Sequence, residues 1–437
     1  MSPVEIGFLS VLAIVAMIYL GVYIPVALAS VSFVTIWIVS DRPILAINFL
    51  RQSIGDSVTE YEFATIPLFT FMGLLVAKAG LGTEIYQVMN QVFRRIRGGI
   101  GMATVGANAV FAAVTGSSIA SASVFTRVSV PEMLRLDYNK RFAVGVVAGS
   151  SVLGMIIPPS AMLIIYSFVA EVSVGDMFIA GILPGILLAL AYIAAIAIMA
   201  KYFPRFVGGR IIEMPAEDLL SWWQIIGKSA PIAILIFIVL GGIYTGWLTP
   251  VEAGAAGSLT ALVIALVRRC ISGRSFWEAL LETGHITASI LFLITTASLY
   301  SRMLGYVDLP NELQGFLDAH ELSFFWIMVA YVILMLFLGT LLDTASIILI
   351  VVPLFIDIIE PMGLSLIWFG IVTVIGAEIG LLTPPLGISC FVIKATLDDD
   401  RISLKDVFLG ALPFAAVMLV ILIILIRFPG ITTILLN

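Results

Sequence analysis

The chain has 437 residues, of which 61% are hydrophobic and 11% are charged, with a net charge of −6. Soluble globular chains carry about 25% charged residues, so this composition, with a mean hydropathy of +1.15, excludes a soluble domain and predicts an all-α polytopic membrane protein. The two cysteines, Cys270 and Cys390, indicate no disulfide framework, and the two histidines, His285 and His320, show no metal-ligand spacing.

The first part of the chain combines apolar and amphipathic segments. Ile6–Val39 is apolar and fits either one long, kinked helix or two short ones, since one span needs about 20 residues. Asp41–Glu62 mixes charged and apolar residues, which predicts an amphipathic helix lying along the membrane interface. Ile66–Val92 then predicts a spanning helix with a weak point at Gly80 and Gly82.

The next apolar segment, Gly99–Val128, has basic residues on both flanks, among them Arg95 and Arg135. Because basic flanks mark the cytoplasmic side, both ends are predicted to be cytoplasmic. The segment is shorter than the roughly 40 residues that two full crossings need. We therefore expect a re-entrant helical hairpin that enters from the cytoplasm, with its tip at Thr115-Gly-Ser-Ser118.

Two adjacent prolines interrupt an apolar segment twice, as Pro158-Pro159 within residues 143–170 and as Pro384-Pro385 within residues 366–394. Proline lacks an amide N–H and restricts the residue before it, so each segment is predicted to be two half-helices with an unwound joint. In lipid, exposed backbone groups cost several kcal/mol each unless the joint is buried in protein or lines a wet cavity. Each joint is therefore a predicted binding site.

The second half contains another apolar pair, Leu322–Glu360, with its tip at Gly339-Thr-Leu-Leu-Asp-Thr344 and acidic residues on both flanks. Its length also fits two short spans. Only its correspondence to Gly99–Val128 predicts a re-entrant hairpin, which here enters from the outside.

The remaining segments follow from hydropathy and flanking charge. The loops Lys201–Lys228 and Arg268–Arg274 are basic and predicted to be cytoplasmic, whereas the acidic loops near Asp176 and from Asp308 to Glu321 are predicted to be external. Ser275–Thr283 predicts a short arm helix, the counterpart of Asp41–Glu62. The other predicted spans are Phe178–Ala200, Ser229–Tyr244, Val251–Val267, Ile286–Leu304 and Val407–Ile426.

The two halves of the chain correspond to each other. Each contains a hairpin followed by a broken helix, and Asp176-Met-Phe-Ile-Ala-Gly-Ile-Leu-Pro184 after the first joint resembles Asp406-Val-Phe-Leu-Gly-Ala-Leu-Pro413 after the second. Paired broken helices in corresponding positions indicate an inverted-repeat transporter. We expect a first repeat over residues 1–210, a connecting region over 211–250 and a second repeat over 251–437, with tips and joints near the bilayer midplane.

Taken together, these motifs resemble the large membrane subunit of tripartite ATP-independent periplasmic (TRAP) transporters. The similarity rests on the two tips, the two Pro-Pro joints, Ile66-Pro-Leu-Phe-Thr-Phe-Met-Gly73 and Glu378-Ile-Gly-Leu-Leu-Thr-Pro-Pro-Leu-Gly387, and covers nearly the whole chain. It implies an elevator-type secondary transporter of the bacterial inner membrane, driven by Na⁺ and without another cofactor. It also implies a small four-helix partner subunit, here a separate chain, and a periplasmic binding protein. The implied substrates are small organic anions: C4-dicarboxylates, sialic acid, keto acids or sulfonates.

The resemblance also places ligand sites on this chain by position. The first Na⁺ site falls on Thr115, Gly116, Ser117, Ser118, Gly154, Ile157 and Pro158. The second falls on Gly339, Thr340, Asp343, Thr344, Gly380, Thr383 and Pro384. The substrate is expected at Ser118, Pro159, Ser160, Thr344 and Pro385.

Four charged residues at membrane depth have alternative interpretations. A charge there costs at least about 2.5–3.5 kcal/mol, so Asp343 and Glu378 either coordinate a cation or cap a half-helix and pair locally. Lys78 and Arg302 are interpreted as snorkelling or structural. Arg302 is retained as a candidate for contacting an anionic substrate.

Other functions predict different features. A stand-alone ion-coupled carrier of the same architecture would need no binding protein. An intramembrane enzyme would need paired catalytic groups, whereas Asp343 and Glu378 belong to the repeated tips and joints. An ATP-driven permease would need an ATPase-docking loop, which Lys201–Lys228 does not resemble. We therefore expect a transporter and not an enzyme, whose surroundings are the lipid bilayer and whose partners include no nucleic acid.

The topology is testable by labelling single cysteines with an impermeant thiol reagent. Cysteines near Arg95 and Arg135 should both react from the cytoplasmic side, and cysteines near Asp318 and Glu360 both from the external side, because each pair flanks a hairpin. Reaction of the Arg95 and Arg135 positions from opposite sides would contradict the re-entrant hairpin and the inverted repeat.

Overall fold

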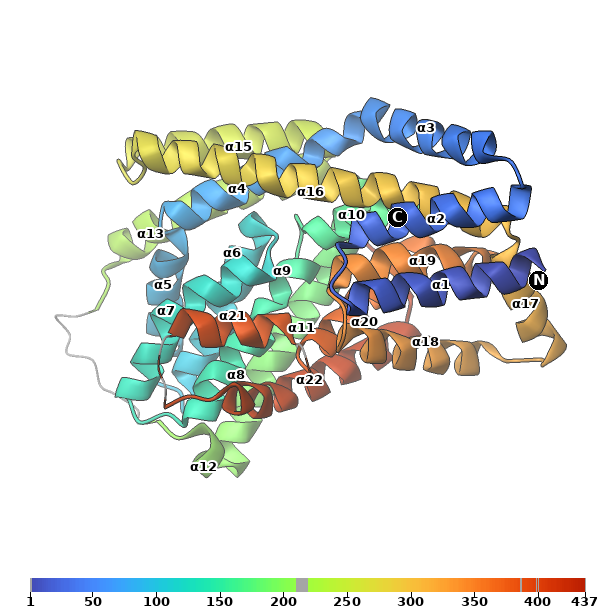
Figure 1. Cartoon of the computed structure of the whole chain (residues 1–437). Coiled ribbons are helices and arrows are strands. Elements are labelled where there is room, and N and C mark those ends of the chain that lie inside the picture. The colour runs from blue at the N-terminus through green and yellow to red at the C-terminus, as the bar shows by residue number, and fades with distance from the viewer. Residues whose placement is uncertain (1, 210–218, 386, 398, 400, 437) are drawn as a thin grey trace.

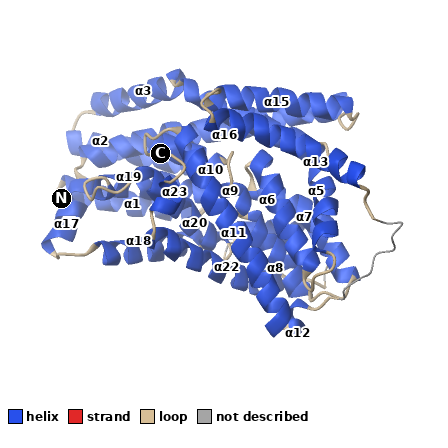
Figure 2. Ribbon diagram, turned by 180° about the vertical axis from the view of Figure 1, so that it is seen from behind, coloured by secondary structure: helices blue, strands red, loops and turns tan. Residues whose placement is uncertain are grey.

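The computed structural model describes residues 2–209, 219–385, 387–397, 399 and 401–436. Within these ranges the regular structure is helical and no strand occurs, apart from one isolated bridge between Tyr138 and Gly208. Figure 2 shows the helices and their connecting loops from behind. The predicted all-α architecture is therefore confirmed for the described part of the chain. Arg210 and the predicted start of the connecting region at 211–218 lie outside the described residues.

In the first half of the chain, α11 is the longest helix and every other helix is much shorter. They are α1 (Pro3–Tyr19), α2 (Ile24–Ser40), α3 (Pro43–Thr59), the 3₁₀ turn η1 (Tyr61–Ala64), α4 (Thr65–Lys78), α5 (Leu81–Phe93), α6 (Gly99–Thr115), α7 (Ser118–Arg135), α8 (Lys140–Ser151), α9 (Leu153–Ile156), α10 (Ala161–Val169), α11 (Val174–Tyr202) and α12 (Pro204–Val207).

The second half contains the longest helix of the described chain, α16. Its elements are α13 (Trp222–Ile236), the π-helical segment η3 (Phe237–Gly241), α14 (Gly242–Tyr244), α15 (Pro250–Val267), α16 (Gly273–Tyr306), α17 (Leu309–Ala319), α18 (Phe324–Gly339), α19 (Thr344–Ile359), α20 (Leu366–Leu381), α21 (Ile388–Leu397), α22 (Leu404–Arg427) and α23 (Gly430–Thr433).

Six of the described helices are long and apolar enough to cross a membrane: α4 with its leading turn, α11, α13 continued to Tyr244, α15, α16 and α22. A seventh candidate is the pair α8–α9 and α10, which is bent by 44°. Three of the four arms of the predicted hairpins, α6, α18 and α19, are shorter apolar helices. The chain is a multi-pass membrane protein.

The structure decides one open boundary and corrects two others. Residues 6–39 form two helices, the second of the two alternatives, separated near Gly21, where φ is +86°. The single helix predicted over residues 66–92 was wrong, because two helices form there, separated at Gly80, where φ is +73°. A left-handed backbone is accessible to glycine without the steric penalty of a Cβ, so each helix ends there. The acidic segment predicted as a loop after Asp308 contains α17 instead.

The predicted arm helix Ser275–Thr283 is not a separate element. Its N-cap is Ser272, whose side chain accepts from Ser275 N, and the helix runs without a break through Ile286–Leu304 to Tyr306. Nothing between Thr283 and Ile286 interrupts helical hydrogen bonding, because Gly284 alone costs only about 1 kcal/mol. The resulting helix of 34 residues is about 50 Å long, well beyond the roughly 30 Å of a hydrocarbon core.

Helices α3, α15 and α16 run along one side of the molecule in both views, with the hairpins and joints beneath them (Figures 1 and 2). Helix α16 packs against α2, α3 and α4, and α15 packs against α4. Two ion pairs join α16 to its neighbours: Lys78 on α4 lies 3.7 Å from Glu278, and Arg302 lies 2.5 Å from Asp56 on α3. The contact with Asp56 supports the structural interpretation of Arg302.

The hairpin-and-joint unit is held together by close helix crossings. Helices α8 and α22 meet at Gly145 and Gly410, where a Cβ on Gly410 would lie 1.9 Å from the carbonyl oxygen of Arg141. Between membrane helices the hydrophobic effect contributes little, so small residues that allow close backbone approach provide the packing. This crossing fixes the start of the first broken helix against the helix that follows the second.

Candidate functional site

The first tip lies between α6 and α7 and consists of two residues. Gly116 has a φ of +60°, which ends α6, and Ser117 is extended and accepts a hydrogen bond from Ala120 N through its side chain (3.3 Å). The hydroxyl of Ser117 thereby caps α7. The tip falls within the predicted Thr115–Ser118.

The first joint covers Ile157–Ser160, between α9 and α10, and its Pro158–Pro159 bond is cis. Ile157 is extended, as expected before a proline. The Ser160 hydroxyl donates to the carbonyl of Met155 (2.5 Å) and accepts from Leu163 N (3.4 Å), so it satisfies groups on both sides of the break. The whole joint is buried.

The first tip touches the first joint through backbone atoms. A Cβ on Gly116 would lie 2.3 Å from the carbonyl oxygen of Pro159, and a Cβ on Gly154 would lie 2.8 Å from the backbone of Ser117. The Ala161 N–H donates to the Gly116 carbonyl across the contact (3.4 Å). The structure therefore brings the predicted residues of the first Na⁺ site together, and two glycines make the approach sterically accessible.

The second tip covers residues 340–343 between α18 and α19. Asp343 caps α19: its carboxylate accepts from Ser346 N (3.3 Å) and from the Ser346 hydroxyl. Asp343 therefore has the capping role that was one of its two interpretations. Its position corresponds to that of Ser117, the cap of α7.

The second tip also touches its joint, which follows α20 and contains a cis Pro384–Pro385 bond. A Cβ on Gly380 would lie 2.4 Å from the Cα of Gly339. The Thr383 hydroxyl donates to the Gly380 carbonyl (2.7 Å), and the Thr344 hydroxyl donates to Oε1 of Glu378 (2.7 Å). The predicted residues of the second site are thus also adjacent, with Glu378 as a further member.

The two tip–joint pairs interlock. Helix α10, which follows the first joint, packs against α19 of the second hairpin, and α21, which follows the second joint, packs against α7 of the first hairpin. Helix α9 also contacts α20. Both pairs therefore belong to one packed unit.

The two joints differ in exposure. Pro158 and Pro159 are buried, and α11 covers them because Gly181 and Gly185 let its backbone approach Ile156 and Ile157. Pro384 and Pro385 are exposed. Of the residues predicted to contact substrate, Ser118, Pro159, Ser160 and Thr344 are buried and Pro385 is at the surface. A largely apolar groove of about 440 Å³ reaches Thr340 and Thr383 from the side of α22.

The oxygen atoms at these pairs fit a hard cation such as Na⁺. Such ions take carbonyl, hydroxyl and carboxylate oxygens, and unwound helices supply carbonyls that no helical N–H reaches. One buried oxygen, Oε2 of Glu378, has no hydrogen-bond partner among the described residues. The described residues contain no group of three His, Cys, Asp or Glu side chains arranged for a metal ion.

Two features escaped the sequence analysis. Asp406, 5% exposed at the start of α22, lies 2.9 Å from Lys140 Nζ and 2.8 Å from Arg141 Nε. A buried carboxylate needs such partners, and here they tie α22 to α8. The sequence showed Asp406 only as part of the repeated motif, because its partners are far away in the chain.

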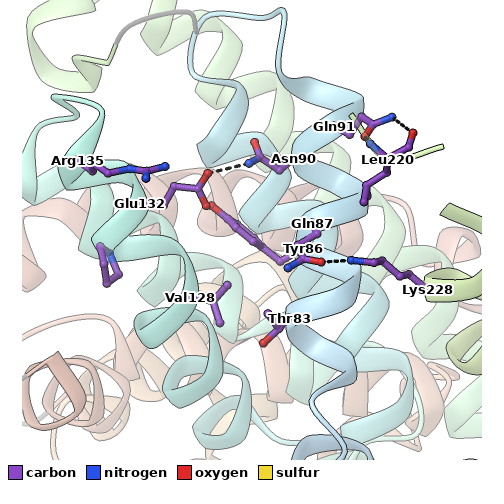
Figure 3. A pocket seen from close by; sticks show the side chains of 11 residues that line it. Thr83, Tyr86, Gln87, Asn90, Gln91, Val128, Glu132, Arg135, Leu220 and Lys228 are labelled. Carbon is purple, nitrogen blue, oxygen red and sulfur yellow. Dashed lines mark hydrogen bonds between the residues drawn. The ribbon is translucent and has the colours of Figure 1, made fainter. Parts of the chain in front are cut away.

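The second feature is a polar cavity of about 670 Å³ between α5, α7 and the start of α13 (Figure 3). Asn90 donates to Glu132 (2.9 Å), Gln91 exchanges two hydrogen bonds with the backbone of Leu220, and Lys228 donates to Gln87. Through α5, these contacts link α7 of the first hairpin to the start of α13. The sequence did not predict this cavity, because uncharged Asn and Gln side chains on α5 indicate only a polar helix face and not its partners.

Comparison with known proteins decides the family. The chain matches the family model described as the tripartite ATP-independent periplasmic transporter, DctM component, over residues 11–431. The chain belongs to this TRAP family. The resemblance drawn from its tips and joints is thereby confirmed, and its relatives are transporter permeases and not enzymes.

Individual TRAP relatives cover most of the chain. The C4-dicarboxylate TRAP transporter large permease of Pseudomonas aeruginosa is 32% identical over 89% of both chains. The sialic acid TRAP transporter large permease of Vibrio cholerae is 26% identical, also over 89% of both. The isethionate TRAP transporter permease DctMQ of Oleidesulfovibrio alaskensis is 27% identical over 98% of this chain, which spans 65% of that protein.

Solved structures show the same fold at low identity. The YdaH transporter of Alcanivorax borkumensis superposes with a TM-score of 0.62 at 13% identity, covering 88% of this TRAP chain and 89% of YdaH. MtrF of Neisseria gonorrhoeae gives a TM-score of 0.61 at 14% identity, covering 87% and 84%. These similarities describe the fold alone.

The contact between the first tip and joint predicts a strong effect of Gly154→Ala. The added methyl would lie 2.8 Å from the Ser117 backbone, which cannot move aside as a flexible side chain would. Overpacking of this kind costs about 1–3 kcal/mol and should separate tip from joint. We expect a more than tenfold loss of uptake rate with a protein that still elutes as a folded species. Gly175→Ala, whose Cβ would have its nearest neighbour at an ordinary 3.5 Å, is the control. Wild-type uptake by Gly154→Ala would contradict the importance of the contact.

Proposed function

We propose that this chain is the large permease subunit of a Na⁺-coupled TRAP transporter that imports a small organic anion across the bacterial inner membrane. The observation that supports this most is the pair of adjacent tips and joints, each offering backbone and side-chain oxygens where a helix is interrupted. Helix interruptions in membrane transporters hold substrates and coupling ions, with N-termini facing anions and carbonyls facing cations.

The proposed architecture is an inverted repeat that moves as an elevator. Its support is that several corresponding helix pairs are in contact in both halves, with α2 matched to α15, α4 to α16, α5 to α17 and α7 to α19. Helix α16 packs on α2 as α4 packs on α15, and α17 packs on α19 as α5 packs on α7. In this proposal α6–α11 and α18–α22 form the moving unit that carries the two pairs. The long helix α16 and the segment α3–α4 are the arms that connect this unit to a static scaffold.

The substrate class is inferred from the relatives' names. These include C4-dicarboxylate, isethionate, sialic acid and 2,3-diketo-L-gulonate permeases. All four compounds are small organic acids that are anionic at neutral pH. We propose a small organic anion for this chain, delivered by a periplasmic binding protein.

A small membrane subunit is the second proposed partner. The support comes from the isethionate permease DctMQ, because this chain accounts for only 65% of its length. We propose that a separate four-helix chain takes the place of the unmatched part. Exposed aromatic and aliphatic side chains on the outer helices, such as Phe237 and Trp247, leave apolar surface for lipid and for such a subunit.

Two coupled Na⁺ ions would provide enough driving force. A tenfold gradient contributes about 1.4 kcal/mol per ion, and a potential of 100 mV about 2.3 kcal/mol per charge. Two ions therefore supply roughly 7 kcal/mol, of which about 5 kcal/mol remain after a monoanion is carried inward against the potential. The remaining free energy supports more than a thousandfold accumulation of substrate, because each tenfold step in concentration costs about 1.4 kcal/mol.

Initial uptake rates in proteoliposomes containing both membrane subunits test this function. With the cognate binding protein present, uptake should rise sigmoidally with external Na⁺. Ser117→Ala, Asp343→Ala and Thr383→Ala should each raise the Na⁺ requirement, with the largest effect for Asp343→Ala because carbonyls remain when a hydroxyl is lost. A hyperbolic dependence would reject two coupled sites, and uptake driven by a proton gradient in K⁺ would reject sodium coupling.

Omission of components separates this function from that of a stand-alone carrier. The chain alone should accumulate no substrate, and uptake should require both the binding protein and the small subunit. Robust uptake by the large subunit alone would instead establish a carrier that needs no binding protein.

A further inference from the structure

One buried carboxylate has a free oxygen at the second tip–joint pair. Glu378 lies on α20 with 0% of its surface exposed. Its Oε1 accepts from the Thr344 hydroxyl, whereas its Oε2 has no hydrogen-bond partner among the described residues. Buried polar atoms are almost always paired, so an unpaired carboxylate oxygen calls for an explanation, and a functional role such as ion binding is one.

Among the described residues, the surroundings of Glu378 add a second carboxylate and no ion-pair partner. Asp343, at the tip, lies within electrostatic range of Glu378, as does Tyr192 on α11, whose hydroxyl is also buried and unpaired. None of the ion pairs found in the described part of the chain includes Asp343 or Glu378. Two neighbouring carboxylates, here buried Glu378 and half-buried Asp343, can both be ionised only if a positive charge lies beside them; otherwise one of them keeps its proton.

The first tip–joint pair lacks both carboxylates. If Gly154 is matched with Gly380, the position of Glu378 corresponds to Val152, and that of Asp343 to Ser117. The first pair therefore presents hydroxyls and carbonyls without formal charge. Structural capping alone does not explain the difference, because Ser117 caps α7 as Asp343 caps α19.

A role for Glu378 as a simple acceptor for Thr344 would also leave its charge unexplained. One neutral oxygen suffices to accept the Thr344 proton, and a glutamine side chain provides it without the desolvation of a carboxylate. Because the Thr344 hydroxyl donates to Glu378, its own lone pairs are left free to face a cation.

We propose that Glu378 is a second charged residue of the second cation site, beside Asp343, where Oε1 orients the Thr344 hydroxyl and Oε2 faces the bound Na⁺. This inference rests on the proposed sodium coupling. It makes the two sites unequal: the second holds its ion by charge, and the first by neutral oxygens. Na⁺ affinity at the second site therefore depends on the carboxylate and not only on the geometry of the tip.

Thermal unfolding of the purified chain in detergent measures Na⁺ binding without a transport assay. Wild type should be stabilised by NaCl relative to KCl at equal ionic strength, because a ligand that binds the folded state raises its stability. Glu378→Gln keeps an acceptor for Thr344 and removes the charge. We expect it to be at least as stable as wild type in KCl, and to need at least tenfold more Na⁺ for half of the stabilisation.

Thr373→Val is the matched control, since Thr373 is also buried on α20 and hydrogen-bonded, to Tyr331 (2.6 Å), but lies outside both pairs. It should change stability equally in NaCl and KCl and leave the Na⁺ half-saturation unchanged. If Glu378→Gln does not fold, Thr344→Val provides the second test and should raise the half-saturation at least threefold.

The outcomes distinguish sodium coupling of the protein from the role of Glu378 in binding the ion. No Na⁺-specific stabilisation of wild type would contradict sodium coupling itself. Stabilisation of wild type with the same half-saturation in Glu378→Gln, or in Thr344→Val where that variant is used, would overturn the role of Glu378 and leave sodium coupling standing. Loss of Na⁺ response together with lower stability in KCl would mean that Glu378 is structural, and would also overturn the proposal.

Discussion

Backbone hydrogen bonding in an apolar medium is the constraint on which this structure depends. Two Pro-Pro pairs interrupt helices that are surrounded by apolar residues, and each break frees carbonyls and amides that lipid cannot satisfy. The protein meets the constraint by placing a hairpin tip against each break. Hydroxyls of Ser160 and Thr383 satisfy part of each joint, and glycines at positions 116, 154, 339 and 380 allow backbone to approach backbone.

The rest of the architecture supports these contacts. Helix α11 buries the first joint through Gly181 and Gly185, and the Gly145–Gly410 crossing positions α8 against α22. The pairing of Asp406 with Lys140 and Arg141 fixes the same two helices at their ends. In our proposal the oxygens that remain unsatisfied are the ones that bind ions, so the same interruption that requires support also provides the function.

Much of this arrangement follows from local chemistry and could be predicted. Proline and glycine determine where helices end, which is why both tips and both joints fall where the sequence placed them. Contacts between distant residues could not be predicted from one sequence: the bond from Thr344 to Glu378, the Asp406 pairs and the exposure of Pro384 but not of Pro158 depend on tertiary packing. The continuity of α16 was also missed, because its polar first turns suggested a separate arm although no residue there breaks a helix.

The ratio of Na⁺ ions to substrate molecules tests the central claim most directly, since two tip–joint pairs predict two ions. It can be obtained from the membrane potential at which net substrate flux reverses, in proteoliposomes with both subunits, the binding protein and fixed gradients of Na⁺ and substrate. The account predicts at least two Na⁺ per substrate molecule. A ratio of one, or a reversal potential that does not change with the Na⁺ gradient, would contradict it.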